Sequence, residues 1–179
     1  MAKKGWLFGV VAMLFAGMVF AAQPLPAGAS FDAGFSPRAG ALDTVLKGIS
    51  AAKQQILVAA YSFSSKPVAT ALLDAQRRGV KVFVVADRKD NSTKYSAAQF
   101  LANYGVPVRL NGNYAIFHHK FMVIDNDSLE LGSFNYSAAA AERNAENVLL
   151  LWHVPGLADT YAREWKRLWD EAEPLPKAY

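Results

Sequence analysis

Residues 116–135 read IFHHKFMVIDNDSLELGSFN, and this stretch decides the fold class. Residues 116–124 and 128–131 have the character of strands, and the residues between them, Asp125-Asn126-Asp127, are typical of a turn. We therefore predict a β-hairpin in this part of the chain.

Outward from the hairpin, helices and strands alternate along the chain. Residues 55–63 and 80–87 are continuous apolar runs, which are typical of buried parallel strands. Apolar spacing and local signals at the element ends predict helices at 39–53, 66–78, 94–104, 137–143 and 155–171, and further strands at 106–110 and 146–152. Parallel strands linked by helices, together with one hairpin, predict an α/β protein: a three-layer α/β/α sandwich with a mixed central sheet.

The first 21 residues have the character of a secretory signal peptide. Lys3 and Lys4 precede an uncharged apolar run at 5–20, which is shorter than the roughly 20 residues of a membrane-spanning helix. We expect cleavage after Ala21 or Ala22. The mature protein would then be exported without a stable membrane anchor, to the periplasm in a bacterium with two membranes. Residues 22–36 are predicted as an extended lead-in and residues 37–179 as the folded domain.

The composition limits the chemistry that is available. A length of 179 residues favours one domain, and the absence of cysteine excludes disulfides, thiolate zinc sites, iron–sulfur clusters and a thiol nucleophile. Without Lys3 and Lys4, 17 of the 19 basic residues remain against 15 acidic ones. This balance permits an anionic partner without demonstrating one.

A histidine and a lysine on one face of a strand form a plausible phosphate site. Side chains alternate along a strand, so His118 and Lys120 would share a face. The ammonium can hold phosphate oxygens, and a neutral imidazole can attack phosphorus. Taken alone, such a pair is more often an incidental basic strand edge. His119 would point to the other face and His153 lies at a strand end, so we expect structural roles for both.

The residues beyond this pair make the pattern far more specific. Six positions match the spacing His-x-Lys-x4-Asp-x6-Gly-Ser-x-Asn without a gap: His118, Lys120, Asp125, Gly132, Ser133 and Asn135. On this motif the chain resembles the phospholipase D superfamily, and in length and architecture it resembles the Nuc-like bacterial endonucleases. The resemblance covers roughly Phe31 to the C-terminus and implies a phospholipase D-like fold.

The resemblance implies that His118 attacks the phosphodiester and forms a phosphohistidine. A glutamate after the Gly-Ser-x-Asn segment would orient the imidazole. Glu146 is the preferred candidate because it leads into a strand and therefore points predictably, whereas the competitor Glu142 lies in a predicted helix.

The other motif residues would act on the phosphate oxygens. Lys120, Ser133 and Asn135 would bind the non-bridging oxygens and neutralise the charge that builds up in the transition state. Asp125 is included as a catalytic candidate because the motif contains it. Strand alternation places Asp125 opposite His118, however, so local hydrogen bonds that fix the turn are an open alternative.

One histidine cannot attack phosphorus and also protonate the leaving group. The chain has no second copy of the motif, so the resemblance implies a twofold homodimer that places two His118 side chains across one phosphate. No carboxylate cluster has the spacing of metal ligands, and we expect neither a metal nor another cofactor.

The motif defines the reaction better than the substrate. Arg88, Lys89 and Arg109 lie near predicted strand ends, where they could follow a nucleic-acid backbone. We expect a non-specific, metal-independent endonuclease that hydrolyses DNA or RNA. One alternative is a phospholipase D-type lipid enzyme, for which we find no apolar membrane-docking segment after the leader. The other is a non-catalytic nucleic-acid-binding module, which the intact motif disfavours.

Overall fold

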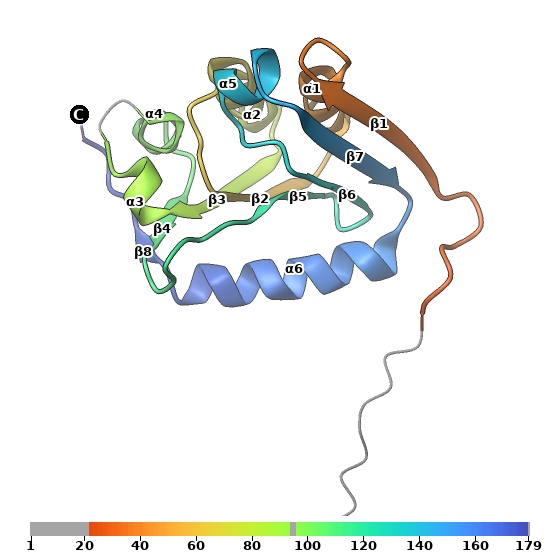
Figure 1. The fold of residues 1–179 in the computed structure, drawn as a ribbon. Coiled ribbons are helices and arrows are strands. Elements are labelled where there is room, and N and C mark those ends of the chain that lie inside the picture. The colour runs from red at the N-terminus through yellow and green to blue at the C-terminus, as the bar shows by residue number, and fades with distance from the viewer. Residues whose placement is uncertain (1–21, 94–95, 179) are drawn as a thin grey trace, which may run out of the picture.

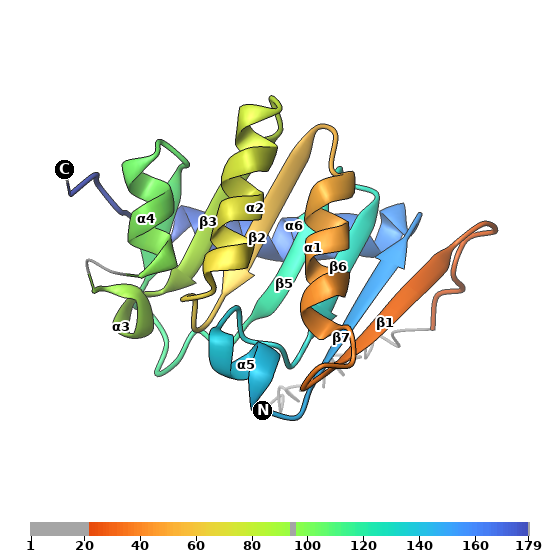
Figure 2. The ribbon, with the colours of Figure 1, turned by 90° about the horizontal axis from the view of Figure 1, so that it is seen from above.

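The computed structural model describes residues 22–93 and 96–178, which build one mixed sheet with helices on both faces (Figures 1 and 2). The predicted signal peptide lies outside the described residues. The eight strands are β1 (Ser30–Ser36), β2 (Gln55–Ala60), β3 (Lys81–Asp87), β4 (Val108–Asn111), β5 (Lys120–Ile124), β6 (Ser128–Gly132), β7 (Glu146–Trp152) and β8 (Glu173–Pro174). Their order in the sheet is β1-β7-β6-β5-β2-β3-β4-β8. Only β2, β3 and β4 run parallel to one another, and the other neighbours are antiparallel. The predicted three-layer sandwich is confirmed.

Six helices complete the layers: α1 (Ala41–Ala51), α2 (Lys66–Arg77), α3 (Arg88–Asn91), α4 (Ala97–Asn103), α5 (Ala138–Glu142) and α6 (Pro155–Asp170). Helices α1, α2, α4 and α5 lie over one face of the sheet, while α6 lies under the other (Figure 1). Helix α2 begins where the sequence predicts it, because the Ser65 side chain accepts a hydrogen bond from the Val68 amide and a proline stands in the first turn. No helix in the two described ranges is long and apolar enough to cross a bilayer.

The hydrophobic core has two parts, one on each face of the sheet. The larger part fills the space between the sheet and helices α1, α2 and α4. The smaller part packs Trp165 and Leu168 of α6 against the inner strands. The Trp165 indole also donates a hydrogen bond of 2.8 Å to the carbonyl of Val58 in β2, which ties α6 to the middle of the sheet.

The structure differs from the sequence prediction at several places, and it contains α3 and β8, neither of which the sequence predicts. Residues 30–36 are an edge strand that pairs with all of β7, so the folded unit includes part of the predicted lead-in. Strand β5 begins at Lys120 and not at residue 116, because the amide of Phe117 donates to the Asp87 side chain instead of to a neighbouring strand. Helix α4 begins at Ala97, and residues 94 and 95 lie outside the described part of the chain.

Candidate active site

Most of the motif residues lie at one end of the central strands of the sheet. Lys120 at the start of β5 pairs with Ala60 at the end of β2. Gly132 ends β6 beside Val148, near the start of β7. His118 therefore lies just before one of these strand ends, and Ser133 follows another, so the fold brings the two halves of the motif together.

Tyr61 contacts both His118 and Lys120. The Tyr61 and His118 ring centroids are 4.9 Å apart at an angle of 60°, and the Lys120 Nζ lies 5.1 Å from the Tyr61 ring centroid. The Lys120 Nζ also donates a hydrogen bond of 2.9 Å to the His118 carbonyl. The imidazole and the ammonium are thus close together, although His118 is not in a regular strand. The sequence analysis missed Tyr61, whose only signal is its place directly after β2.

The electrostatic environment of Lys120 is set by burial and by Glu146. Partial burial lowers the pKa of the Lys120 ammonium, and the negative charge of Glu146 opposes that shift. His118 is exposed at the surface. The site therefore combines a partly desolvated cation with an imidazole that substrate can reach.

Glu146 is bound to Ser133 and not to His118. Its Oε2 accepts a hydrogen bond of 2.6 Å from the Ser133 hydroxyl, and its Oε1 accepts one of 2.9 Å from the side-chain Nδ2 of Asn144. Among the hydrogen bonds of the described residues, none joins Glu146 to His118. The structure places Glu146 in the site, while its orienting action on His118 stays a prediction. Its competitor Glu142 is exposed on α5.

The Ser133 hydroxyl both donates and accepts a hydrogen bond within the site. Besides donating to Glu146, it accepts a hydrogen bond of 3.1 Å from the Asn147 amide. Asn135 differs, because its Oδ1 is buried and has no hydrogen-bond partner within the described part of the chain. This oxygen is an acceptor and could not bind phosphate oxygens, so the contact of Asn135 with the phosphate stays a prediction that would have to use its side-chain NH₂ group.

A buried acid supports the segment that carries Asn135. The Tyr136 hydroxyl donates a hydrogen bond of 2.7 Å to Glu130, and both side chains are buried. Burial raises the pKa of Glu130 to about 8, and it also raises the pKa of Tyr136. The Tyr136 carbonyl accepts hydrogen bonds of 2.8 Å from the amides of Ser64 and Ser65. Sequence reasoning missed this pair, although a glutamate inside an apolar strand was a usable signal.

Two buried polar side chains at the end of β3 hold the active-site loops. Asp87 Oδ2 accepts a hydrogen bond of 2.8 Å from the amide of Phe117, the residue before His118. Asn91 donates to the Tyr61 carbonyl at 2.6 Å and accepts from the Phe63 amide at 3.1 Å. The β3–α3 junction thus positions both His118 and Tyr61.

Asp125 is not part of this site. It follows β5 at the end opposite Lys120, about 17 Å away at the usual rise per strand residue. Its carboxylate accepts hydrogen bonds of 2.8–2.9 Å from the amides of Lys53, Gln54 and Gln55. The structure does not bring Asp125 to the other motif residues, and its catalytic role stays a prediction. Its hydrogen bonds favour the structural alternative, although they reach the loop before β2 rather than staying within the turn.

The three proposed basic groove residues have different surroundings. Arg109 donates to the Trp169 carbonyl at 2.9 Å and lies over the Trp169 ring, so the fold engages it at the end of α6. Arg88 forms an ion pair of 2.8 Å with Glu173. Lys89 is exposed on α3, beside the site edge. Of the three, Lys89 is the one whose side chain is most free to contact a substrate, while Arg88 and Arg109 are engaged in contacts within the fold.

The remaining histidines make structural contacts, as predicted. His119 lies edge-on between the rings of Phe117 and Phe121, and burial lowers its pKa. His153 Nδ1 lies 3.0 Å from the Asp127 carboxylate, beside the hairpin turn. Across residues 22–93 and 96–178, no group of three or more histidine or acidic side chains could hold a metal ion.

Comparison with known proteins assigns the family. The family described as "Cardiolipin synthase, PLD-like domain" matches residues 45–169. Phospholipase D of Rickettsia conorii is 37% identical over 131 residues, which are 73% of this chain and 65% of that protein. Mitochondrial cardiolipin hydrolase of Xenopus laevis is 32% identical over 134 residues, which are 75% of this chain and 63% of that protein. The chain thus spans less than two thirds of the length of these two relatives.

Among solved structures, Nuc from Salmonella typhimurium, a phospholipase D family member, superposes with a TM-score of 0.81 at 36% identity. The match covers 83% of this chain and 99% of Nuc. The family match and the structural match agree with the motif that the sequence carries. The chain belongs to the phospholipase D superfamily and has the architecture of Nuc.

Proposed function

We propose that this chain is a phosphodiesterase that cleaves nucleic acid, with His118 as the nucleophile. The observation that carries the proposal is the contact of an exposed imidazole and a partly buried ammonium with the same Tyr61 ring. In this proposal Lys120 holds phosphate oxygens while a neutral His118 attacks phosphorus. The Nuc-like architecture of the chain supports this assignment.

The reaction would proceed in two displacements at phosphorus. First, an imidazole nitrogen of His118 forms a bond to phosphorus, the bond to the leaving oxygen breaks, and an acid gives that oxygen a proton. Then water attacks phosphorus, the nitrogen–phosphorus bond breaks, and the proton of the water passes to the group that acted as the acid. The two steps return the site to its starting state and need no oxidant or reductant.

The acid in this scheme would come from a second copy of the chain. Once His118 is bonded to phosphorus it cannot protonate the leaving oxygen, and His119 and His153 make structural contacts elsewhere. A twofold dimer would supply a second, protonated His118 on the far side of the phosphate. Sedimentation equilibrium should then give twice the mass of the purified chain, whereas a fully active monomer would contradict the scheme.

An open site favours a polymer as the substrate. His118 and Ser133 are exposed at the sheet edge, and the exposed Lys89 lies on the α3 turn that holds the same loops. A strand of DNA or RNA can lie across such an edge at an internal phosphate, and backbone contacts carry no sequence information. We therefore propose an endonuclease of low sequence specificity.

Lipid is the second candidate substrate, and one observation favours it. Phe31 and Phe35 on the edge strand β1 are 67% and 57% exposed, and both lie on the same face of that strand. The sequence analysis found no apolar docking segment, but these two exposed side chains could contact a membrane. Exposed aromatic residues can enter the interface of a bilayer, and two relatives are called phospholipase D and cardiolipin hydrolase.

The deciding experiment incubates the purified protein with supercoiled plasmid in excess EDTA. We expect nicked and then linear plasmid, with no cleavage by His118→Ala. Lys81→Ala is the control. Lys81 is an exposed lysine at the start of β3, at the end of the strands that lies away from the motif residues. Vesicles of cardiolipin and phosphatidylcholine are assayed in parallel for head-group release. Intact plasmid together with lipid cleavage that depends on His118 would replace nucleic acid by lipid as the substrate.

A further inference from the structure

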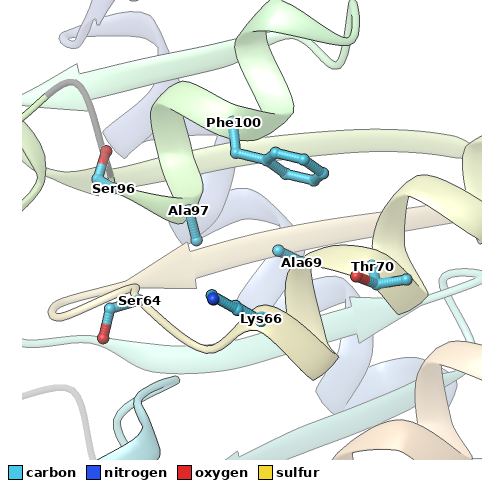
Figure 3. Close-up of a pocket in the computed structure, with 7 residues that line it drawn as sticks. All are labelled: Ser64, Lys66, Ala69, Thr70, Ser96, Ala97 and Phe100. Atoms are coloured by element: carbon cyan, nitrogen blue, oxygen red, sulfur yellow. The ribbon is translucent and has the colours of Figure 1, made fainter.

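A cavity of about 270 Å³ lies beside the proposed active site, between helices α2 and α4 (Figure 3). Its polar lining includes Ser64, Lys66 and Thr70, and its apolar lining includes Ala97 and Phe100. Figure 3 shows the Lys66 ammonium between Ser64 and Ala97, with the Phe100 ring above Ala69 and Thr70. None of the functional residues in the motif lines this cavity.

The cavity shares its wall with the active site. The Ser64 amide donates a hydrogen bond of 2.8 Å to the carbonyl of Tyr136, the residue that follows Asn135. On the opposite wall, the Ala97 amide donates a hydrogen bond of 3.1 Å to the carbonyl of Phe63. The loop from Tyr61 to Ser65 therefore borders His118 at one end and the cavity at the other. A chain-like substrate held at the motif can continue into this space.

The lining fits one unit of a nucleic-acid strand. Phe100 offers an aromatic ring on which a base can stack, and Lys66 offers a positive charge for a phosphate. Hydroxyl groups of Ser64 and Thr70 can hydrogen-bond to a sugar or a base edge. Among the described lining residues there is no carboxylate that would repel a phosphate. The volume is near the lower limit for ligand pockets, which suits a single nucleotide.

We propose that this cavity is a nucleotide subsite, which holds a nucleotide next to the scissile phosphate with its base on Phe100 and its phosphate at Lys66. The proposal rests on the proposed nucleic-acid substrate. It adds a second binding contact for that substrate, outside the reacting phosphate. The subsite explains how an exposed site could select a strand over a small diester: the strand fills the cavity, whereas a small diester contacts only the motif.

The test compares two substrates of different length. Bis(p-nitrophenyl) phosphate carries one phosphodiester and is too short to occupy both places, while a single-stranded dodecanucleotide can fill both. For Lys66→Ala and Phe100→Leu we expect the KM for the dodecanucleotide to rise roughly tenfold relative to the KM for the small diester, with kcat little changed. Lys66 is exposed, so its substitution should preserve the fold even if the Phe100 variant is unstable. Lys81→Ala should leave both KM values unchanged.

Two results would overturn the subsite, and they are distinguishable. If both variants cleave the dodecanucleotide with the KM of the unmodified protein, the subsite is wrong and the proposed nuclease function stands. If the unmodified protein hydrolyses bis(p-nitrophenyl) phosphate but cleaves no oligonucleotide, the proposed substrate class fails and the subsite fails with it. A KM ratio that rises for both variants supports the subsite.

Discussion

The ring of Tyr61 lies 4.9 Å from the ring of His118, so a residue outside the motif contacts the proposed nucleophile. Lys120 lies over the same tyrosine ring, and a cation over an aromatic face is held by the ring's electron density. We therefore expect Tyr61 to position both groups.

Truncation of Tyr61 should lower the rate more than it weakens binding. For Tyr61→Ala we expect kcat on bis(p-nitrophenyl) phosphate to fall about tenfold, which corresponds to about 1.4 kcal/mol of lost transition-state stabilisation, with a small change in KM. Tyr61→Phe keeps the ring and should keep the rate. Steady-state kinetics decide this, and equal rates for the alanine variant and the unmodified protein would show that the ring contact has no catalytic effect.

The alkaline side of the pH–rate profile should report Lys120. Burial lowers the pKa of its ammonium, so the charge that holds the phosphate is lost at a lower pH than for an ordinary lysine. Activity should fall as the pH rises through that lowered pKa. Since Glu146 opposes the shift, Glu146→Gln should move this limb to still lower pH. If the pH at which activity falls is the same in Glu146→Gln as in the unmodified protein, the two residues are not electrostatically coupled.

Glu130 should make the fold less stable as the pH rises. Its pKa is about 8 in the folded protein and near 4.5 when exposed, so the folded state holds a proton that the unfolded chain releases between these values. The free energy of unfolding should therefore decrease by about 1.4 kcal/mol per pH unit in this range. Urea denaturation at several pH values measures the slope. Glu130→Gln should remove much of it, while Glu142→Gln, an exposed glutamate, should leave the slope unchanged.

Asp125 should matter for stability and not for chemistry. Asp125→Ala removes three hydrogen bonds to the backbone before β2, which we expect to destabilise the protein by about 3 kcal/mol. At a temperature where the variant remains folded, kcat should equal that of the unmodified protein. A large loss of kcat in a folded Asp125→Ala would favour the catalytic role over the structural one.

Much of the fold could be predicted from the sequence because local patterns encode it. The continuous apolar runs at β2 and β3 and the proline in the first turn of α2 are signals that neighbouring residues carry by themselves. Strand β1 escaped prediction, because its alternation is weak near several glycine and proline residues and its pairing partner β7 is far away in the sequence.

The site was predictable only as far as the motif spacing reaches. Spacing identified His118, Lys120 and Asn135, but it could not show that Asp125 bonds to the loop before β2 or that Arg109 caps the end of α6. Those contacts join segments that are distant in the sequence, so no local pattern encodes them. The same holds for Asn91, whose hold on the Tyr61 carbonyl is visible only in three dimensions.

The pairing of β2 with β5 also determines when the contacts of Tyr61 form during folding. Tyr61 follows β2 and Lys120 opens β5, and the segment from α2 to β4 separates them in the sequence. Closing so long a loop is entropically costly and comes late in folding relative to local helix formation. The contacts of Tyr61 with His118 and Lys120 therefore form only once the centre of the sheet is complete.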